Sequence, residues 1–269
     1  MVRSGVWMLL AALAAGPAMA QDKPVPVSAP ETTPWRETFD RLDPAIWETQ
    51  LYSFPANGCN MTSAQTAVAS GKLTLSLVMN DAVTKDAPKM CNAGEVGSYR
   101  FFTYGLFTVR MKAPAVPGGV SAFFLMNAWQ PENWEHREID IELLGKNPDA
   151  IQMTTHDFQN GGRDWKNAAT TADLGFDYSR QFHDYAILWT AEAVRWYVDG
   201  KLLHTEARYV PHEPLQIRMN TYLGDPKTPG ISQWLGPIDT TKVPAKAEYG
   251  EIDYYPLDAL PAGFKIDGK

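Results

Sequence analysis

The sequence predicts an all-β antiparallel sandwich. Short segments that are apolar, or that alternate between apolar and polar residues, follow one another along the chain and are separated by Gly, Pro, Asn and Asp, as is typical of strands joined by turns. After residue 20, no window carries apolar residues at helical spacing over three turns, which argues against long amphipathic helices. Hydrophobic residues make up 45% of the 269 positions, enough to build the core of one large domain. We expect that domain over residues 35–257, with residues 258–269 as a short polar tail.

The first twenty residues are typical of an export signal. Arg3 gives a positive start, residues 6–15 form a short apolar stretch, and residues 18–20 form a small-x-small cleavage site. The stretch is too short to span a bilayer, and a buried N-terminal helix is the alternative. Residues 21–34 contain four prolines and predict an extended tether. We therefore expect a secreted or periplasmic protein without membrane contact once the signal peptide is removed.

The predicted strands come next in the chain. One pair forms a predicted hairpin, because Val194–Val198 and Lys201–His204 are joined by Asp199-Gly200, a preferred two-residue turn. Strand side chains alternate between two faces, so each strand can bury one of them. The other segments with this character are residues 73–78, 106–111, 120–126, 151–155, 185–189 and 215–222.

Charge and cysteine content narrow the possible functions. The chain has 24 basic against 31 acidic residues, a net charge of -7, which excludes binding of nucleic acid through a basic face. Cys59 and Cys91 are the two cysteines. An oxidising compartment would let them pair, two buried free thiols are the alternative, and the lack of nearby His argues against a metal site. Aromatic residues make up 12%, which predicts either an aromatic core or a surface for stacking flat ligands.

The most informative stretch is residues 136–145. With period two, Glu138, Asp140 and Glu142 share one strand face, and the Ile and Leu residues between them share the other. Three like charges in a row repel, and strands disfavour Asp and Glu. Cleavage of a glycosidic bond with retention explains the row, because it needs a carboxylate nucleophile and a carboxylic acid, and a third carboxylate helps to separate their pKa values. A solvated strand face and a calcium site are the alternatives.

The motif EIDIELLG at residues 138–145 resembles the active-site strand of glycoside hydrolase family 16, in the form that licheninases and xyloglucan transglycosylases carry. The resemblance extends over nearly the whole domain, because residues 94–96, 104–112, 174–177, 182–185 and 196–200 match later and earlier strands in order. It implies a jelly-roll β-sandwich, like concanavalin A, with a concave substrate cleft. It also implies that Glu138 is the nucleophile, Asp140 the supporting carboxylate and Glu142 the general acid/base, with no cofactor for the chemistry.

The resemblance implies a set of substrate-binding residues as well. Gly97 stands where licheninases hold an arginine, so one donor-subsite contact is missing, and His156 stands where they usually hold an aromatic residue. His136 replaces a licheninase tryptophan, as in the transglycosylases. Three of the implied substrate-binding residues also have a simpler explanation. His136 would be a salt partner of the acidic strand, Phe124 a core residue, and Trp234 a residue that anchors its loop. The implied substrate-binding residues are Tyr52, Asn57, Glu95, Phe124, His136, Asn220, Tyr222 and Trp234.

Two structural features follow from the same resemblance. Cys59 and Cys91 match the disulfide spacing of secreted licheninases. Those enzymes also hold a structural calcium ion on the convex side, for which Gly71, through its carbonyl, and Asp253 are the candidate ligands here. An ordinary turn glycine and a surface aspartate explain both residues equally well.

Together these features predict a secreted, retaining endo-β-glucanase, acting as a monomer on a polysaccharide. The substrate would be a β-1,3/1,4-linked glucan or a bacterial exopolysaccharide with a similar backbone. A transglycosylase acting on the same polymers is one alternative. A carbohydrate-binding sandwich without turnover is the other, although a lectin has no need of two Glu flanking an Asp.

Overall fold

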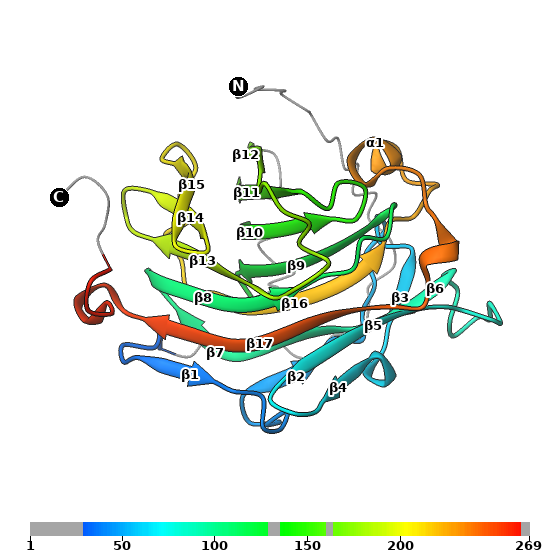
Figure 1. Cartoon of the computed structure of the whole chain (residues 1–269), viewed down its shortest axis with the longest axis horizontal. Coiled ribbons are helices and arrows are strands. Elements are labelled where there is room, and N and C mark those ends of the chain that lie inside the picture. The colour runs from blue at the N-terminus through cyan, green and yellow to red at the C-terminus, as the bar shows by residue number, and fades with distance from the viewer. Residues whose placement is uncertain (1–28, 129–134, 160–163, 265–269) are drawn as a thin grey trace.

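The computed structural model of the chain describes residues 29–128, 135–159 and 164–264. The predicted signal peptide and the tether up to residue 28 lie outside the described residues. Two sheets stack face to face (Figure 1). This is the expected all-β sandwich, and among the described strands only β3 and β6 run parallel to each other.

Within the described residues, the two sheets contain seventeen strands. The ten-stranded sheet runs in the order β15 (Lys201–Glu206), β14 (Val194–Val198), β13 (His183–Trp189), β8 (Gly105–Lys112), β17 (Ala245–Tyr255), β5 (Leu73–Met79), β6 (Cys91–Ala93), β3 (Cys59–Met61), with β1 (Trp35–Glu37) on β17 and β4 (Thr66–Val68) on β5. The seven-stranded sheet runs in the order β12 (Asp164–Asp173), β11 (Ala150–Gln159), β10 (His136–Leu144), β9 (Gly119–Met126), β16 (Leu215–Leu223), β7 (Glu95–Phe102), β2 (Trp47–Thr49). In the part of the chain that the structure describes, the helical segments are short: α1 (Ile231–Leu235) and the 3₁₀ turns Ser63–Gln65, Thr240–Lys242 and Leu257–Ala259.

All six predicted segments and the hairpin are strands in the structure. At the hairpin turn, Asp199 and Gly200 have φ of 48° and 77°, the left-handed conformations that a type I′ turn requires. Three long strands, β7, β12 and β17, have no counterpart among these predicted segments. In β17 the alternation is interrupted by a register shift between Tyr249 and Ile252, and β12 is rich in Thr, Ala and Asp, so neither has the apolar pattern of a strand in its sequence.

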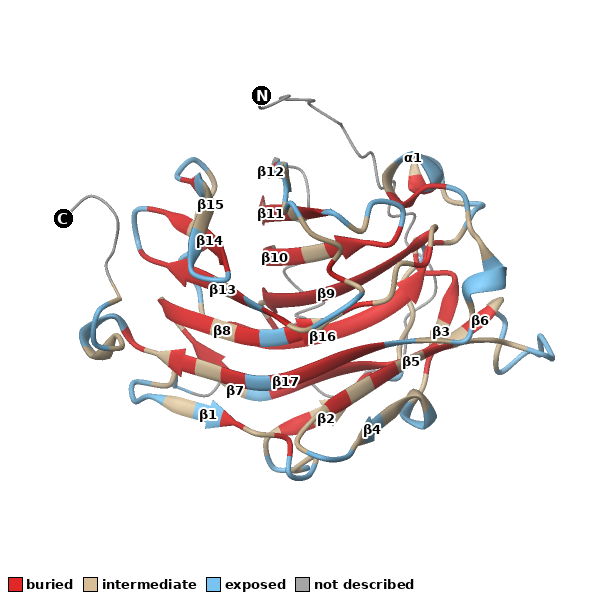
Figure 2. Ribbon diagram, in the orientation of Figure 1, coloured by how far each residue is buried: buried red, intermediate tan, exposed pale blue. Residues whose placement is uncertain are grey.

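The core lies between the sheets and also ties them together by hydrogen bonds. Ile139, Ile141 and Leu143 of β10 are fully buried in it, as the alternation predicts, and β9 and β16 are buried along most of their length (Figure 2). The indole of Trp196 on β14 donates to the backbone carbonyl of Asp140 at 2.9 Å. The hydroxyl of Tyr249 on β17 lies 2.9 and 2.8 Å from two further carbonyls, those of Ala122 on β9 and Asn220 on β16.

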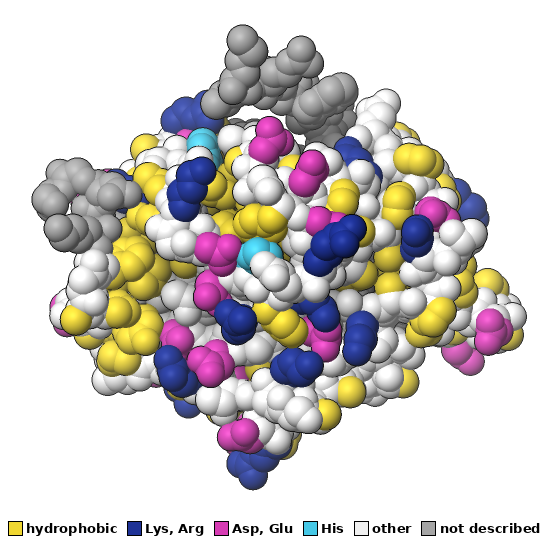
Figure 3. Space-filling view, viewed as in Figure 1, with side chains coloured by type: hydrophobic (Ala, Val, Ile, Leu, Met, Phe, Trp, Pro, Cys, Tyr) yellow, Lys and Arg dark blue, Asp and Glu magenta, His cyan; other side chains and the backbone are white. Residues whose placement is uncertain are grey.

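Both ends of the described chain pack against the domain. The Glu31 amide donates to the Phe101 carbonyl, and its carboxylate pairs with Arg100, so the last residues of the predicted tether are held. Leu260 and Phe264, in the segment expected to be a polar tail, pack on an apolar cluster formed by Leu106, Leu188 and Tyr197. On the face of the molecule in view, Lys and Arg side chains are interspersed with Asp and Glu (Figure 3).

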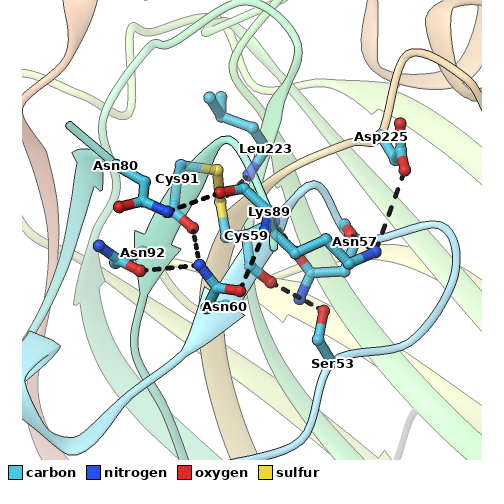
Figure 4. The surroundings of a disulfide bond; sticks show 10 residues. All are labelled: Ser53, Asn57, Cys59, Asn60, Asn80, Lys89, Cys91, Asn92, Leu223 and Asp225. Atoms are coloured by element: carbon cyan, nitrogen blue, oxygen red, sulfur yellow. Dashed lines mark hydrogen bonds and ion pairs between the residues drawn. A yellow bond between two sulfur atoms is a disulfide. The ribbon is translucent and has the colours of Figure 1, made fainter. Parts of the chain in front are cut away.

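The predicted disulfide between Cys59 and Cys91 is confirmed (Figure 4). The two residues are register partners on the parallel strands β3 and β6, with Cα atoms 4.3 Å apart. The Asn60 side chain donates to the Cys91 carbonyl at 3.2 Å and to Asn92 Oδ1 at 2.9 Å. The disulfide and these hydrogen bonds together fasten β3 to the edge of the ten-stranded sheet.

Replacing both cysteines with alanine is expected to lower the free energy of unfolding by about 3–4 kcal/mol, since the bridge closes a loop of 32 residues and so restricts the unfolded chain. Denaturant unfolding of the double variant, compared with the wild type in its oxidised form, measures the difference. An unchanged midpoint and slope would contradict the expectation.

Candidate active site

The three acidic residues of β10 lie on the open face, defined here as the face of the seven-stranded sheet turned away from the ten-stranded sheet. β10 is the third strand of this sheet, between β11 and β9, so its side chains have neighbours on both sides. Glu138 is in register with His156 on β11, and Asp140 with Thr154. Glu142 is in register with Gln152 on β11 and with Ala122 on β9. Each carboxylate therefore has a different polar partner, which can give it a different pKa.

Glu138 is held in its ionised form. Its Oε2 lies 2.6 Å from Nε2 of His136, two residues away on the same strand face. Burial raises the pKa of Glu138, but the charge and hydrogen bond of His136, the nearby His156 and a hydrogen bond with Asp140 outweigh it, so that the net shift is downward. His136 is therefore a polar partner of Glu138, which is the simpler of the two roles considered for it from the sequence. Its ring stacks on Phe158, with the ring centroids 5.3 Å apart.

The surroundings of Asp140 favour its protonated form. Burial and the charges of Glu138 and Glu142 raise its pKa well above the usual value. Nε2 of His156 lies 3.5 Å from its Oδ2, and burial lowers the pKa of His156 to about 4 against the pull of Glu138, so this imidazole is neutral. Within the described residues, Glu138, Asp140 and His156 also form a group whose possible metal-ligand atoms lie within 4.8 Å of one another.

Glu142 has the pKa expected of a general acid near neutral pH. Burial raises its pKa to about 7, in spite of hydrogen bonds from Thr154 and Gln152 and with help from the Glu138 charge. Nε2 of Gln152 donates to Oε2 of Glu142 at 2.5 Å, and the Thr154 hydroxyl donates to the same oxygen at 2.9 Å. Trp234 of α1 donates to Oε1 of Gln152 at 3.3 Å, so it orients the amide that contacts Glu142.

A second polar cluster lies around Glu95 of β7, which is three strands from β10 in the sheet. Its Oε1 accepts from the Tyr52 hydroxyl and from Nη1 of Arg218, each at 3.2 Å. Its Oε2 accepts from Nδ2 of Asn220 at 3.2 Å. Burial raises the pKa of Glu95, although Arg218, Asn220 and Tyr52 all favour the ionised form. Three residues predicted to bind substrate, Tyr52, Glu95 and Asn220, are therefore brought together.

The remaining predicted substrate-binding residues are placed less uniformly. Phe124 lies on the open face, since its neighbours Phe123 and Leu125 are the core residues of β9. Tyr222 packs edge-on against Phe54 at 5.3 Å. Asn57 is fully buried, and its Oδ1 accepts from the Cys59 amide at 2.7 Å, so its contacts belong to the loop beside the disulfide.

Three side chains of the two clusters were absent from the sequence prediction: Gln152, Thr154 and Arg218. Gln152 and Thr154 follow the period of two from His156 on β11, and Arg218 follows it from Asn220 on β16. Extending the alternation outward from these two residues would have found all three. Their partners, by contrast, depend on the strand register, which no single segment contains.

The candidate calcium ligands do not fit a calcium site. Asp253 is in register with Arg36, whose Nε and Nη2 donate to its two carboxylate oxygens at 2.5 and 3.1 Å. A guanidinium in this position supplies the positive charge that a bound calcium ion would bring. Gly71 has a φ of 68° and lies in a tight turn, in which the backbones of Ala69 and Lys72 hydrogen-bond to each other. An ordinary turn glycine was the alternative explanation for this residue.

Thermal unfolding is accordingly expected to give the same Tm in excess EDTA and in millimolar calcium. A ligand that binds only the folded state raises Tm with its concentration, so a calcium-dependent rise would contradict this expectation. Arg36→Met is the informative control, because it frees Asp253 and is the variant in which a calcium effect could emerge.

No helix within residues 29–128, 135–159 and 164–264 combines the length and the apolar character that a membrane span requires.

The sequence and the fold are similar to those of known glycoside hydrolases. The profile of the glycosyl hydrolases family 16 matches residues 56–244. A beta-glucanase of Acetivibrio thermocellus is 34% identical over 229 residues, which are 83% of this chain and 63% of that relative. A beta-glucanase of Brevibacillus brevis is 32% identical over 85% of this chain and 84% of its own length.

The solved structures agree with the sequence relatives. A prokaryotic beta-1,3-1,4-glucanase (lichenase) derived from a mouse hindgut metagenome superposes with a TM-score of 0.73 and 30% identity, over 84% of this chain and all of that one. The expected jelly-roll fold is thereby confirmed. Since the family profile covers more than half of the residues and includes the whole of β10, the chain belongs to glycosyl hydrolases family 16.

Proposed function

We propose that this chain is a retaining endo-β-glucanase that hydrolyses a β-1,3/1,4-linked glucan. One observation carries the proposal: Glu138 and Glu142 lie on the same strand face with pKa values shifted in opposite directions. A retaining glycosidase needs this split, with one carboxylate ionised and one carboxylic acid protonated near neutral pH. The beta-glucanase and lichenase relatives support the choice of polymer.

In the first step, a carboxylate oxygen of Glu138 attacks the anomeric carbon and forms a glycosyl ester. Glu142 gives its proton to the glycosidic oxygen, the bond between that oxygen and the anomeric carbon breaks, and the distal part of the chain leaves as an alcohol. Asp140 keeps its own proton and its hydrogen bond with Glu138, and His136 holds the nucleophile in place.

In the second step, Glu142, now ionised, removes a proton from a water molecule. The resulting oxygen attacks the anomeric carbon, the ester to Glu138 breaks, and both carboxyl groups return to their starting protonation states. The hydrogen bonds from Gln152 and Thr154 favour the ionised Glu142 that this step requires. The surroundings of Glu142 therefore suit both its acid role in the first step and its base role in the second.

Export is part of the proposal. Residues 1–20 have the pattern of a signal peptide, and the disulfide is the kind of bond that persists in an oxidising compartment. We propose that the chain acts outside the cytoplasm as a monomer on a polysaccharide.

Product mapping tests the proposed reaction. The enzyme is incubated with lichenan, laminarin, xyloglucan and an acidic exopolysaccharide, and NMR follows the anomeric configuration of the first product. Retained β configuration on lichenan or laminarin is expected. An inverted first product would overturn the nucleophile assignment, and transfer to an added oligosaccharide with little hydrolysis would instead identify a transglycosylase.

The rate is expected to follow a bell-shaped pH profile. As pH rises through the lowered pKa of Glu138, the nucleophile ionises and kcat/KM increases; as pH rises through about 7, Glu142 loses its proton and kcat/KM decreases. Because the two groups interact, the limbs report pKa values of the pair. Initial rates between pH 3 and 10 measure both limbs, and a profile with no decrease on the alkaline side would contradict the acid role of Glu142.

A further inference from the structure

Gly97, at the position where an arginine was expected, lies beside an arginine of the neighbouring strand. Gly97 on β7 and Arg218 on β16 are register partners. A Cβ atom at Gly97 would lie 3.1 Å from Nε2 of Gln50, and 3.5 Å from Cγ and 3.6 Å from Cζ of Arg218, the last two being ordinary van der Waals distances. The Arg218 side chain therefore packs alongside Gly97.

The guanidinium is buried beside a carboxylate. Arg218 is 3% exposed and Glu95 is 1% exposed. Nη1 of Arg218 donates to Glu95 at 3.2 Å and to the Tyr52 hydroxyl at 3.3 Å. The two opposite charges cancel at close range, so this part of the open face carries a polar group without a net charge of its own.

Two polar atoms of this cluster remain unused among the described residues. Nε of Arg218 and Oδ1 of Asn220 are buried and have no hydrogen-bond partner, although such atoms in proteins are nearly always paired. One is a donor and the other an acceptor. A sugar hydroxyl can accept from the first and donate to the second, which is the pairing that a neutral carbohydrate offers.

The distance between this cluster and the carboxyl groups of β10 suits a different sugar unit of the same polysaccharide. Arg218 is in register with Phe124 on β9, and Phe124 is in register with Asp140 on β10. Two strand spacings amount to about 10 Å. A ligand held there is not the sugar that Glu138 attacks but one further along the polymer.

We propose that Arg218 is a substrate-binding residue that recognises a hydroxyl group of an uncharged sugar at this end of the open face, together with Asn220. The proposal rests on the proposed function and adds a substrate class to it. Because Glu95 already neutralises Arg218, the site does not require a carboxylate or sulfate on the sugar. The selected polymer is therefore a neutral glucan rather than an acidic exopolysaccharide.

Kinetics with neutral β-glucan oligosaccharides of increasing length test this role. Arg218→Met is expected to raise KM about tenfold or more for oligosaccharides long enough to reach the cluster, as lost hydrogen bonds to a charged group do, with kcat changed by less than about threefold. For the shortest cleaved oligosaccharide, KM is expected to stay unchanged. An equal loss at every length, or no loss at any length, would overturn the proposal.

Two further variants separate binding from a structural ion pair. Arg218→Lys keeps the positive charge beside Glu95 but has no Nε donor, so it is expected to keep the wild-type Tm while KM rises as in Arg218→Met. Full recovery of KM by lysine would overturn the proposal. The double variant Gly97→Arg with Arg218→Met returns the arginine to the other strand and is expected to recover most of the lost affinity. Arg110→Met, on an exposed arginine paired with Asp184, is the matched control and is expected to leave KM unchanged.

The outcome for Arg218 can be told apart from the outcome for the reaction itself. If the wild type cleaves an acidic exopolysaccharide and no neutral glucan, the enzyme is a hydrolase and the inference on Arg218 fails. If the wild type cleaves nothing, calorimetric titration of wild type and Arg218→Met with a neutral oligosaccharide still measures the binding role. Equal affinity of the two proteins in that titration would overturn it.

Discussion

Replacing Glu138 with alanine is expected to abolish hydrolysis while leaving the binding of oligosaccharides intact. Without the carboxylate no glycosyl ester forms, and the loss in kcat should reach at least about 10⁴-fold, or about 5 kcal/mol in transition-state free energy. The substituted side chain is half-buried on the open face, so the core beneath it is unchanged. Initial rates on lichenan and calorimetric titration with a lichenan oligosaccharide measure the two effects.

The matched control is Glu251→Ala, which removes an exposed glutamate of β17 and is expected to retain full activity. Cleavage by Glu138→Ala at a tenth of the wild-type rate would contradict the nucleophile assignment. If the wild type bound oligosaccharides but cleaved no glucan, the chain would instead be a carbohydrate-binding sandwich without turnover.

Glu142→Gln is expected to lose about 10²–10⁴-fold on polysaccharide, the usual contribution of a general acid. The amide keeps the size of the side chain but has no proton of suitable pKa to give to the departing oxygen. On an aryl glycoside whose phenolate departs without protonation, formation of the glycosyl ester should be nearly normal. The alkaline limb of the pH profile near pH 7 should disappear, because it reports the loss of the proton from Glu142.

Rapid-mixing measurements of phenolate release distinguish this role from a purely structural one. A burst of phenolate followed by slow turnover is expected, since the second step also lacks its base. Equal losses on the polysaccharide and on the activated aryl glycoside would contradict the assignment of Glu142 as the acid.

Local patterns in the sequence predicted many of the strands and the arrangement of side chains on β10. Alternation on β10 places three carboxylates on one face and three aliphatic residues in the core, and that is a property of a single strand. The turn at Asp199-Gly200 is equally local. The resemblance to family 16 then supplied the roles of the three carboxylates, because its motif lies within one segment.

What the sequence could not predict depends on pairing between distant segments. Arg218 reaches Glu95 because β16 and β7 are neighbours in one particular register, although 123 positions separate the two residues. The calcium expectation for Asp253 came from the family resemblance, and its pairing with Arg36, 217 positions away on the adjacent strand, was not visible in the local sequence. In both cases the chemistry of a side chain is decided by a neighbour that no local window contains.

The bonds that Trp196 and Tyr249 make across the core have a consequence for turnover. Their donors are on the ten-stranded sheet, and their acceptors are backbone carbonyls on β10, β9 and β16, three adjacent strands of the open face. The backbone of the seven-stranded sheet is thus fastened to the sheet behind it at three adjacent strands, so the two cannot shift independently there. The precision with which the carboxyl groups meet a sugar ring is therefore partly a property of residues that no substrate ever touches.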